Sequence, residues 1–110
     1  MAWSRTGGIA GFCDRLEVYA TGDVFVSTCA AEPAETLAHG YLSAAEAEHL
    51  FIWIDTLEGF EIARSDWAVA DSMTTGLLFG GGGSAERSTV DEDAMLAYAA
   101  ALFARVAPQL

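Results

Sequence analysis

The chain has 110 residues, the size of one domain, and no stretch approaches the ~18 consecutive apolar residues of a membrane-spanning helix. Its net charge of −11 comes from 16 acidic residues against five basic ones, all of which are arginine. So acidic a surface repels nucleic acid and anionic lipid, and it attracts a basic partner. We therefore expect a single domain, residues 1–110, that neither binds nucleic acid nor inserts into a membrane.

The first part of the chain has the pattern of a β-hairpin. Residues 12–20 and residues 23–29 each alternate between apolar and polar side chains, as half-buried strands do. Residues 20–22, "ATG", suit a tight three-residue hairpin loop in which Gly22 adopts a positive φ. We also expect a short strand at residues 2–6, ahead of the hairpin.

A three-residue loop fixes which residues of the hairpin lie opposite each other. The expected pairs are Tyr19–Asp23, Val18–Val24, Leu16–Val26 and Arg15–Ser27. This register gathers the apolar residues on one face and sets Cys13 directly opposite Cys29 on the other. Opposed strand residues lie about 4.5–5.5 Å apart, a span that a disulfide bridges. We therefore predict a Cys13–Cys29 disulfide; the alternative is two free cytosolic thiols.

The middle of the chain predicts a helix between two less regular segments. Residues 30–42 read as a connection, because a proline and a glycine interrupt them. Ser43 and Glu46 form a capping box, from which we expect a helix to about Glu58. Gly59 then suits the residue that closes the helix in a left-handed conformation.

Two further strands and a second helix complete the expected elements. Residues 60–63 suggest a short strand followed by a loop, and residues 73–80 a longer strand. The glycines at 80–83 suggest a flexible turn that leads to a returning edge strand at 84–89. The second helix begins near Asp91 and ends before the proline close to the C-terminus. This order predicts an α+β fold, with a mainly antiparallel sheet and two helices packed on one face.

Each expected helix carries an apolar stripe at helical spacing. The first stripe comprises Ala47, Leu50, Trp53, Ile54 and Leu57. The second comprises Met95, Ala99, Leu102, Phe103 and Val106. Phe51 and Ile52 lie outside the first stripe, so they either widen the buried face or contribute to a contact surface.

The sequence assembles no recognisable set of catalytic, cofactor-binding or metal-binding residues. The glycine-rich opening precedes a strand, whereas a dinucleotide-binding motif opens a helix, and the chain has no lysine for a phosphate-binding loop. Two cysteines without a nearby histidine cannot form a structural zinc site. No nucleophile has an adjacent base. We therefore expect a protein that is not an enzyme and that holds no cofactor or metal.

The opening sequence "SRTGGIAGF" suggests a binding loop. Its glycines permit positive φ and close approach to another surface, so Ile9 and Phe12 would be presented from a base clamped by the disulfide. The residues of this candidate partner-binding loop are Gly7, Gly8, Ile9, Ala10, Gly11 and Phe12. Trp67, in an irregular acidic segment, is a candidate second contact. The alternative is a plain bend between two strands with Ile9 in the core.

The stretch from Ser4 to Phe12 resembles the opening "S-x-x-G-G-[FI]-A-G-[IF]" of emfourin-type proteins, small bacterial inhibitors of thermolysin-like metalloproteases. Chain length and the order of the elements also match that family, although the family's first helix comes sooner than here. The resemblance implies a non-enzymatic, extracytoplasmic protein that binds a protein partner, such as a secreted metalloprotease. Similar openings occur in bacterial envelope proteins, so a structural or accessory envelope domain is the alternative.

Overall fold

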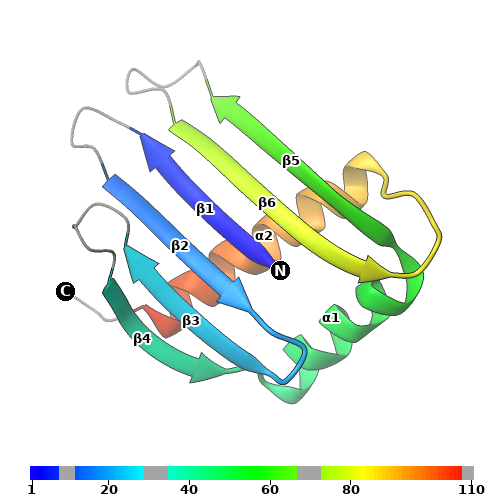
Figure 1. Cartoon of the computed structure of the whole chain (residues 1–110), viewed down its shortest axis with the longest axis horizontal. Coiled ribbons are helices and arrows are strands. Elements are labelled where there is room, and N and C mark those ends of the chain that lie inside the picture. Colours follow the sequence, from blue (N-terminus) through cyan, green and yellow to red (C-terminus); the bar gives the residue numbers. More distant parts are fainter. Residues whose placement is uncertain (8–11, 29–34, 67–72, 108–110) are drawn as a thin grey trace.

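The computed structural model describes residues 1–7, 12–28, 35–66 and 73–107 (Figure 1). They form a six-stranded sheet in the order β4-β3-β2-β1-β6-β5, and every neighbouring pair of strands is antiparallel. Both helices lie on one face of this sheet, so the predicted α+β architecture is confirmed. The elements are β1 (Ala2–Gly7), β2 (Phe12–Val18), β3 (Asp23–Thr28), β4 (Glu35–Tyr41), α1 (Ala44–Thr56), β5 (Glu58–Asp66), β6 (Met73–Gly82) and α2 (Thr89–Val106).

The hairpin formed by β2 and β3 has the register that its loop length predicts. The observed pairs are Val18–Val24, Leu16–Val26 and Arg15–Ser27. The backbone N–H of Tyr19 donates to the carbonyl of Asp23 at 3.0 Å, and Gly22 has a φ of 93°. Because only glycine adopts that φ without strain, the loop and the register follow from the local sequence.

A single row of apolar side chains crosses all six strands beneath the helices. The row comprises Ala38, Val26, Leu16, Trp3, Leu77 and Ile62, each opposite its neighbour in the sheet. The indole of Trp3 in the central strand β1 packs against Phe103 of α2, with ring centres 5.4 Å apart. Burial of one such large side chain stabilises a fold by about 1.5–3 kcal/mol, so this row anchors α2 to the sheet.

The first helix begins as predicted and ends earlier than predicted. The backbone N–H of Glu46 donates to the hydroxyl of Ser43 at 3.2 Å, and the backbone N–H of Ser43 donates to the carboxylate of Glu46 at 2.7 Å. At the other end, Leu57 closes the helix in an extended conformation, and the chain turns at once into β5. Gly59 therefore lies in a strand and does not cap the helix, because the buried Leu57 directs the chain back onto the sheet.

The second helix begins two residues before Asp91, because Ser88 and Asp91 form a capping box that the sequence analysis missed. Near its end, Arg105 donates to the carboxylate of Glu46 at 2.6 Å and to the carbonyl of Tyr41 at 2.9 Å. Burial alone would raise the pKa of Glu46, but its hydrogen bonds from the Ser43 backbone and from Arg105 lower it overall. In the described part of the chain, neither helix is long and apolar enough to cross a membrane.

The interpretation of residues 30–42 as a connection is wrong, because residues 35–41 form the edge strand β4. Gly40 lies in this strand beneath α2, where an added Cβ would come within 3.1 Å of both methyl groups of Val106. The glycine therefore marks a close approach between strand and helix rather than a break. The short strand expected at 60–63 is also longer than predicted, since β5 continues to Asp66.

The predictions of a flexible turn at 80–83 and of a returning strand at 84–89 are also wrong. Residues 80–82 continue β6, and Gly81 lies so close to Leu57 and Glu58 that an added Cβ would overlap their backbone atoms. Residues 84–88 contain only one isolated bridge, between Ala85 and Leu57. Both edges of β6 are already occupied by β1 and β5, so a returning strand has no partner edge there.

Candidate functional site at the loop end of the sheet

Three connections between strands leave the same end of the sheet, which we call the loop end (Figure 1). They join β1 to β2, β3 to β4 and β5 to β6. The strand ends that define the loop end are Gly7, Phe12, Thr28, Glu35, Asp66 and Met73. Connections grouped at one end of a rigid sheet are a common way to build a binding surface.

The two segments that the sequence singled out as contacts are neighbours at this end. Met73 of β6 pairs with Gly7 of β1 on one side and with Asp66 of β5 on the other. The candidate loop starts directly after Gly7, and Trp67 follows Asp66 directly in the chain. Two segments about 60 residues apart in sequence are therefore anchored on β1 and β5, with only β6 between them.

The described members of the candidate loop are its two ends. Gly7 has a φ of 130°, a conformation that side-chain-bearing residues rarely adopt, and its backbone pairs with that of Phe12. The middle of the loop, residues 8–11, lies outside the described residues, as do Cys29 and Trp67. The exposure of Ile9 and the role of Trp67 therefore stay predictions.

Polar contacts brace the strands just below the loop end. Arg5 of β1 forms a salt bridge with Asp14 of β2 at 3.0 Å, two residues from the strand ends. The hydroxyl of Thr28 donates to the carbonyl of Cys13 at 3.1 Å, across the β2–β3 pair. These bonds link neighbouring strands to one another at the loop end, so the strand ends are held in place there.

The predicted disulfide would add a covalent link at this base. The described pairing of β2 with β3 ends at Asp14 and Thr28, one position before Cys13 and Cys29. No free cysteine is found among the described residues, which include Cys13. The pairing itself stays a prediction, because Cys29 lies outside them.

We expect the natively isolated protein to show no free thiol when it is unfolded without reductant, and two after reduction. Reduction, or a Cys13→Ser/Cys29→Ser double change, should lower the free energy of unfolding by about 3 kcal/mol, because the open chain gains entropy when unfolded. Thiol counting and urea denaturation measure both effects. Two reactive thiols in the unreduced protein would contradict the pairing and, with it, the extracytoplasmic location.

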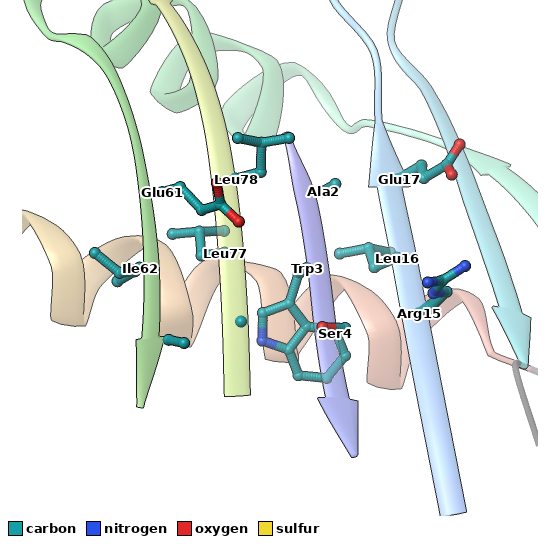
Figure 2. A pocket seen from close by; sticks show the side chains of 12 residues that line it. Ala2, Trp3, Ser4, Arg15, Leu16, Glu17, Glu61, Ile62, Leu77 and Leu78 are labelled. Atoms are coloured by element: carbon teal, nitrogen blue, oxygen red, sulfur yellow. The ribbon is translucent and has the colours of Figure 1, made fainter. Parts of the chain in front are cut away.

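The face of the sheet opposite the helices carries a shallow hollow of about 340 Å³ over the central strands (Figure 2). Its floor is formed by small residues of β1, β5 and β6, and Glu17 and Glu61 stand at its two sides. These two glutamates are separated by β1 and β6, so their backbones lie about 14 Å apart.

An aromatic strip on the same open face escaped the sequence analysis. Phe25 of β3 stacks on His39 of β4, with ring centres 4.4 Å apart and planes 10° apart, and Tyr41 adjoins His39. His39 also contacts the carboxylate of Asp23 at 2.9 Å. The pKa of Asp23 is lowered by its hydrogen bonds, first from Thr21 and then from His39. The missed signal was the alternation of His39 and Tyr41, hidden because their strand was interpreted as a connection.

In the described part of the chain, no group of three or more histidine, cysteine or acidic residues is placed to hold a metal ion. Comparison with protein family models, curated proteins and solved structures gave no match. The resemblance to emfourin-type inhibitors, which depends on Ser4–Phe12, the chain length and the order of the elements, therefore stays a prediction.

Proposed function

We propose that this protein is a non-enzymatic protein-binding domain that uses the loop end of its sheet to bind a partner. The observation that carries the proposal is the double pairing of Met73 with Gly7 and Asp66. It anchors the glycine-rich segment and the segment of Trp67 on strands separated only by β6. Because these anchors lie on either side of one strand, we expect a single protein partner to contact both segments.

The partner that fits best is a secreted metalloprotease of the thermolysin type. The support is the resemblance of "SRTGGIAGF" to emfourin-type inhibitors, together with a loop that is anchored on paired strands at both ends. Ile9 or Phe12 would fill an apolar subsite of the protease. The net charge of −11 would speed the encounter with a basic protein surface.

The alternative is a structural or accessory domain of a bacterial cell envelope. In that case Ile9 would close a plain bend and contact the protein's own core. The acidic surface and the predicted disulfide fit this role as well as they fit an inhibitor, so only a binding experiment separates the two functions.

We expect Ile9→Asp to weaken inhibition of a susceptible thermolysin-like protease by about 30-fold or more, because a charged group would enter an apolar subsite. Ile52→Asp is the matched control, since Ile52 is 56% exposed on α1 and belongs to a different part of the molecule. Inhibition constants against a panel of such proteases, with circular dichroism of both variants, measure the effect.

Two results would contradict the proposal. If the wild-type protein inhibits no protease of the panel, it is not an inhibitor of this class. If Ile9→Asp inhibits as well as Ile52→Asp, the loop does not enter the active-site cleft. A folded Ile9→Asp variant with lower stability than Ile52→Asp would favour the envelope alternative, in which Ile9 is part of the core.

A further inference from the structure

A cavity of about 560 Å³ lies between α2 and the ends of β1, β5 and β6. Its helix wall consists of Leu96, Ala97 and Ala100, whose small or apolar side chains leave room above the sheet. Its volume falls within the 300–1,000 Å³ range that is usual for binding pockets. The cavity is separate from the hollow on the open face, because it lies on the helix side of the sheet.

The polar side chains that line this cavity supply hydrogen-bond donors. They include Arg5, Arg64, Thr75 and the indole of Trp3, and no carboxylate occurs among the described lining residues. Two of the five arginines of a chain with 16 acidic residues thus meet at one cavity. Arg5 already pairs with Asp14 and Arg64 with Asp93, so the lining favours a ligand that carries hydrogen-bond acceptors for the remaining N–H and O–H donors.

The indole N–H of Trp3 is the clearest sign of a missing acceptor. Trp3 is only 3% exposed, and among the described residues its Nε1 has no hydrogen-bond partner. Figure 2 shows this nitrogen on the side of the ring that faces β6 and β5. A buried N–H without an acceptor costs about 1–3 kcal/mol, so a bound acceptor atom would remove a real penalty.

Arg64 is held in place at the cavity by acids of α2. Its guanidinium contacts Asp93 at 2.5 Å and Glu92 at 3.6 Å, and the hydrogen bond to Asp93 raises its pKa. A guanidinium carries five N–H donors, so these contacts orient Arg64 and still leave donors for a ligand. Neither acid lines the cavity itself.

We propose that this cavity binds a carboxylate carried on a small apolar group. The carboxylate would accept from Trp3, Arg64 and Thr75, while the apolar group would pack against the helix wall. A ligand of this kind is either a free carboxylic acid or the C-terminal residue of a peptide. The proposal holds without the protease-inhibitor function, since it concerns other residues and direct binding tests it.

The test is titration of the ¹⁵N-labelled protein, followed through the indole N–H signal of Trp3 in two-dimensional NMR spectra. Hexanoate represents a free acid, and acetyl-Gly-Gly-Leu represents a peptide C-terminus; hexanamide and the amidated peptide are their uncharged controls. We expect the Trp3 signal to move saturably with one or both carboxylates, while that of Trp53 on α1 stays in place. The probe that binds more tightly identifies the source. No saturable shift with either carboxylate, or equal shifts with the amides, would overturn the proposal.

Two arginine variants check the location. Arg64→Met should weaken binding about tenfold, because it removes charge-assisted donors and keeps the aliphatic stem. Arg87→Met is the matched control, since Arg87 also contacts Glu92, at 3.9 Å, but does not line the cavity. Thr75→Val provides a second, nearly isosteric test and should weaken binding severalfold. Equal losses in Arg64→Met and Arg87→Met would contradict binding in this cavity.

Discussion

Gly81→Ala is expected to destabilise the protein by about 3 kcal/mol or more, and Gly80→Ala, one residue earlier, to leave its stability nearly unchanged. A Cβ at Gly81 would overlap the carbonyl of Leu57 and would lie 2.8 Å from the carbonyl carbon of Glu58. These are backbone atoms at the junction of α1 and β5, so they cannot turn aside as a flexible side chain would. At Gly80 an added Cβ meets no atom within 4 Å.

Urea denaturation followed by tryptophan fluorescence would measure both changes in the free energy of unfolding. The two variants make the same chemical change in the same glycine run, so helix or strand propensity cannot explain a difference between them. If Gly81→Ala were as stable as Gly80→Ala, the close approach of β6 to the end of α1 would be wrong.

Leu50→Ala is expected to lower the free energy of unfolding by about 2–5 kcal/mol, because it removes buried methyl groups and leaves a cavity in the core. Leu50 is 1% exposed and belongs to the core between α1 and the sheet. Ile52, two residues later on the same helix, is 56% exposed, so Ile52→Ala should change stability by no more than about 0.5 kcal/mol.

Thermal and urea denaturation of the two variants, side by side, would test this prediction. A large loss in Ile52→Ala would mean that the outer face of α1 is covered by another molecule in solution, such as a second copy of the chain. Equal and small losses in both would mean that α1 does not pack on the sheet as described.

The proposed functions occupy two adjoining regions of one end of the molecule. Gly7 and Asp66 lead into the predicted contact segments, while Arg5 and Arg64, two residues before each of them, line the cavity. The Ile9→Asp and Arg64→Met variants therefore separate partner binding from carboxylate binding. A loss of both properties in both variants would indicate a single continuous site.

Several features were determined by short stretches of sequence. The loop at Gly22 fixed the register of β2 with β3, since only one spacing puts the valines and Leu16 on one face. The capping box of Ser43 and Glu46 marked the start of α1. Each of these depends on residues within about a dozen positions of one another, so local conformational preference and alternation were enough to predict them.

The tertiary structure alone decided the order of the strands and what the glycines do. The sequence pattern of residues 35–41 is broken by Gly40, yet these residues form a strand because β3 offers a free edge and α2 requires room above the glycine. Conversely, residues 84–89 form no strand, because β1 and β5 already occupy both edges of β6. Edge occupancy and close packing depend on segments far apart in the chain, so no local pattern encodes them. The same long-range pairing of Met73 with Gly7 and Asp66 brings the candidate contact segments to one end of the sheet.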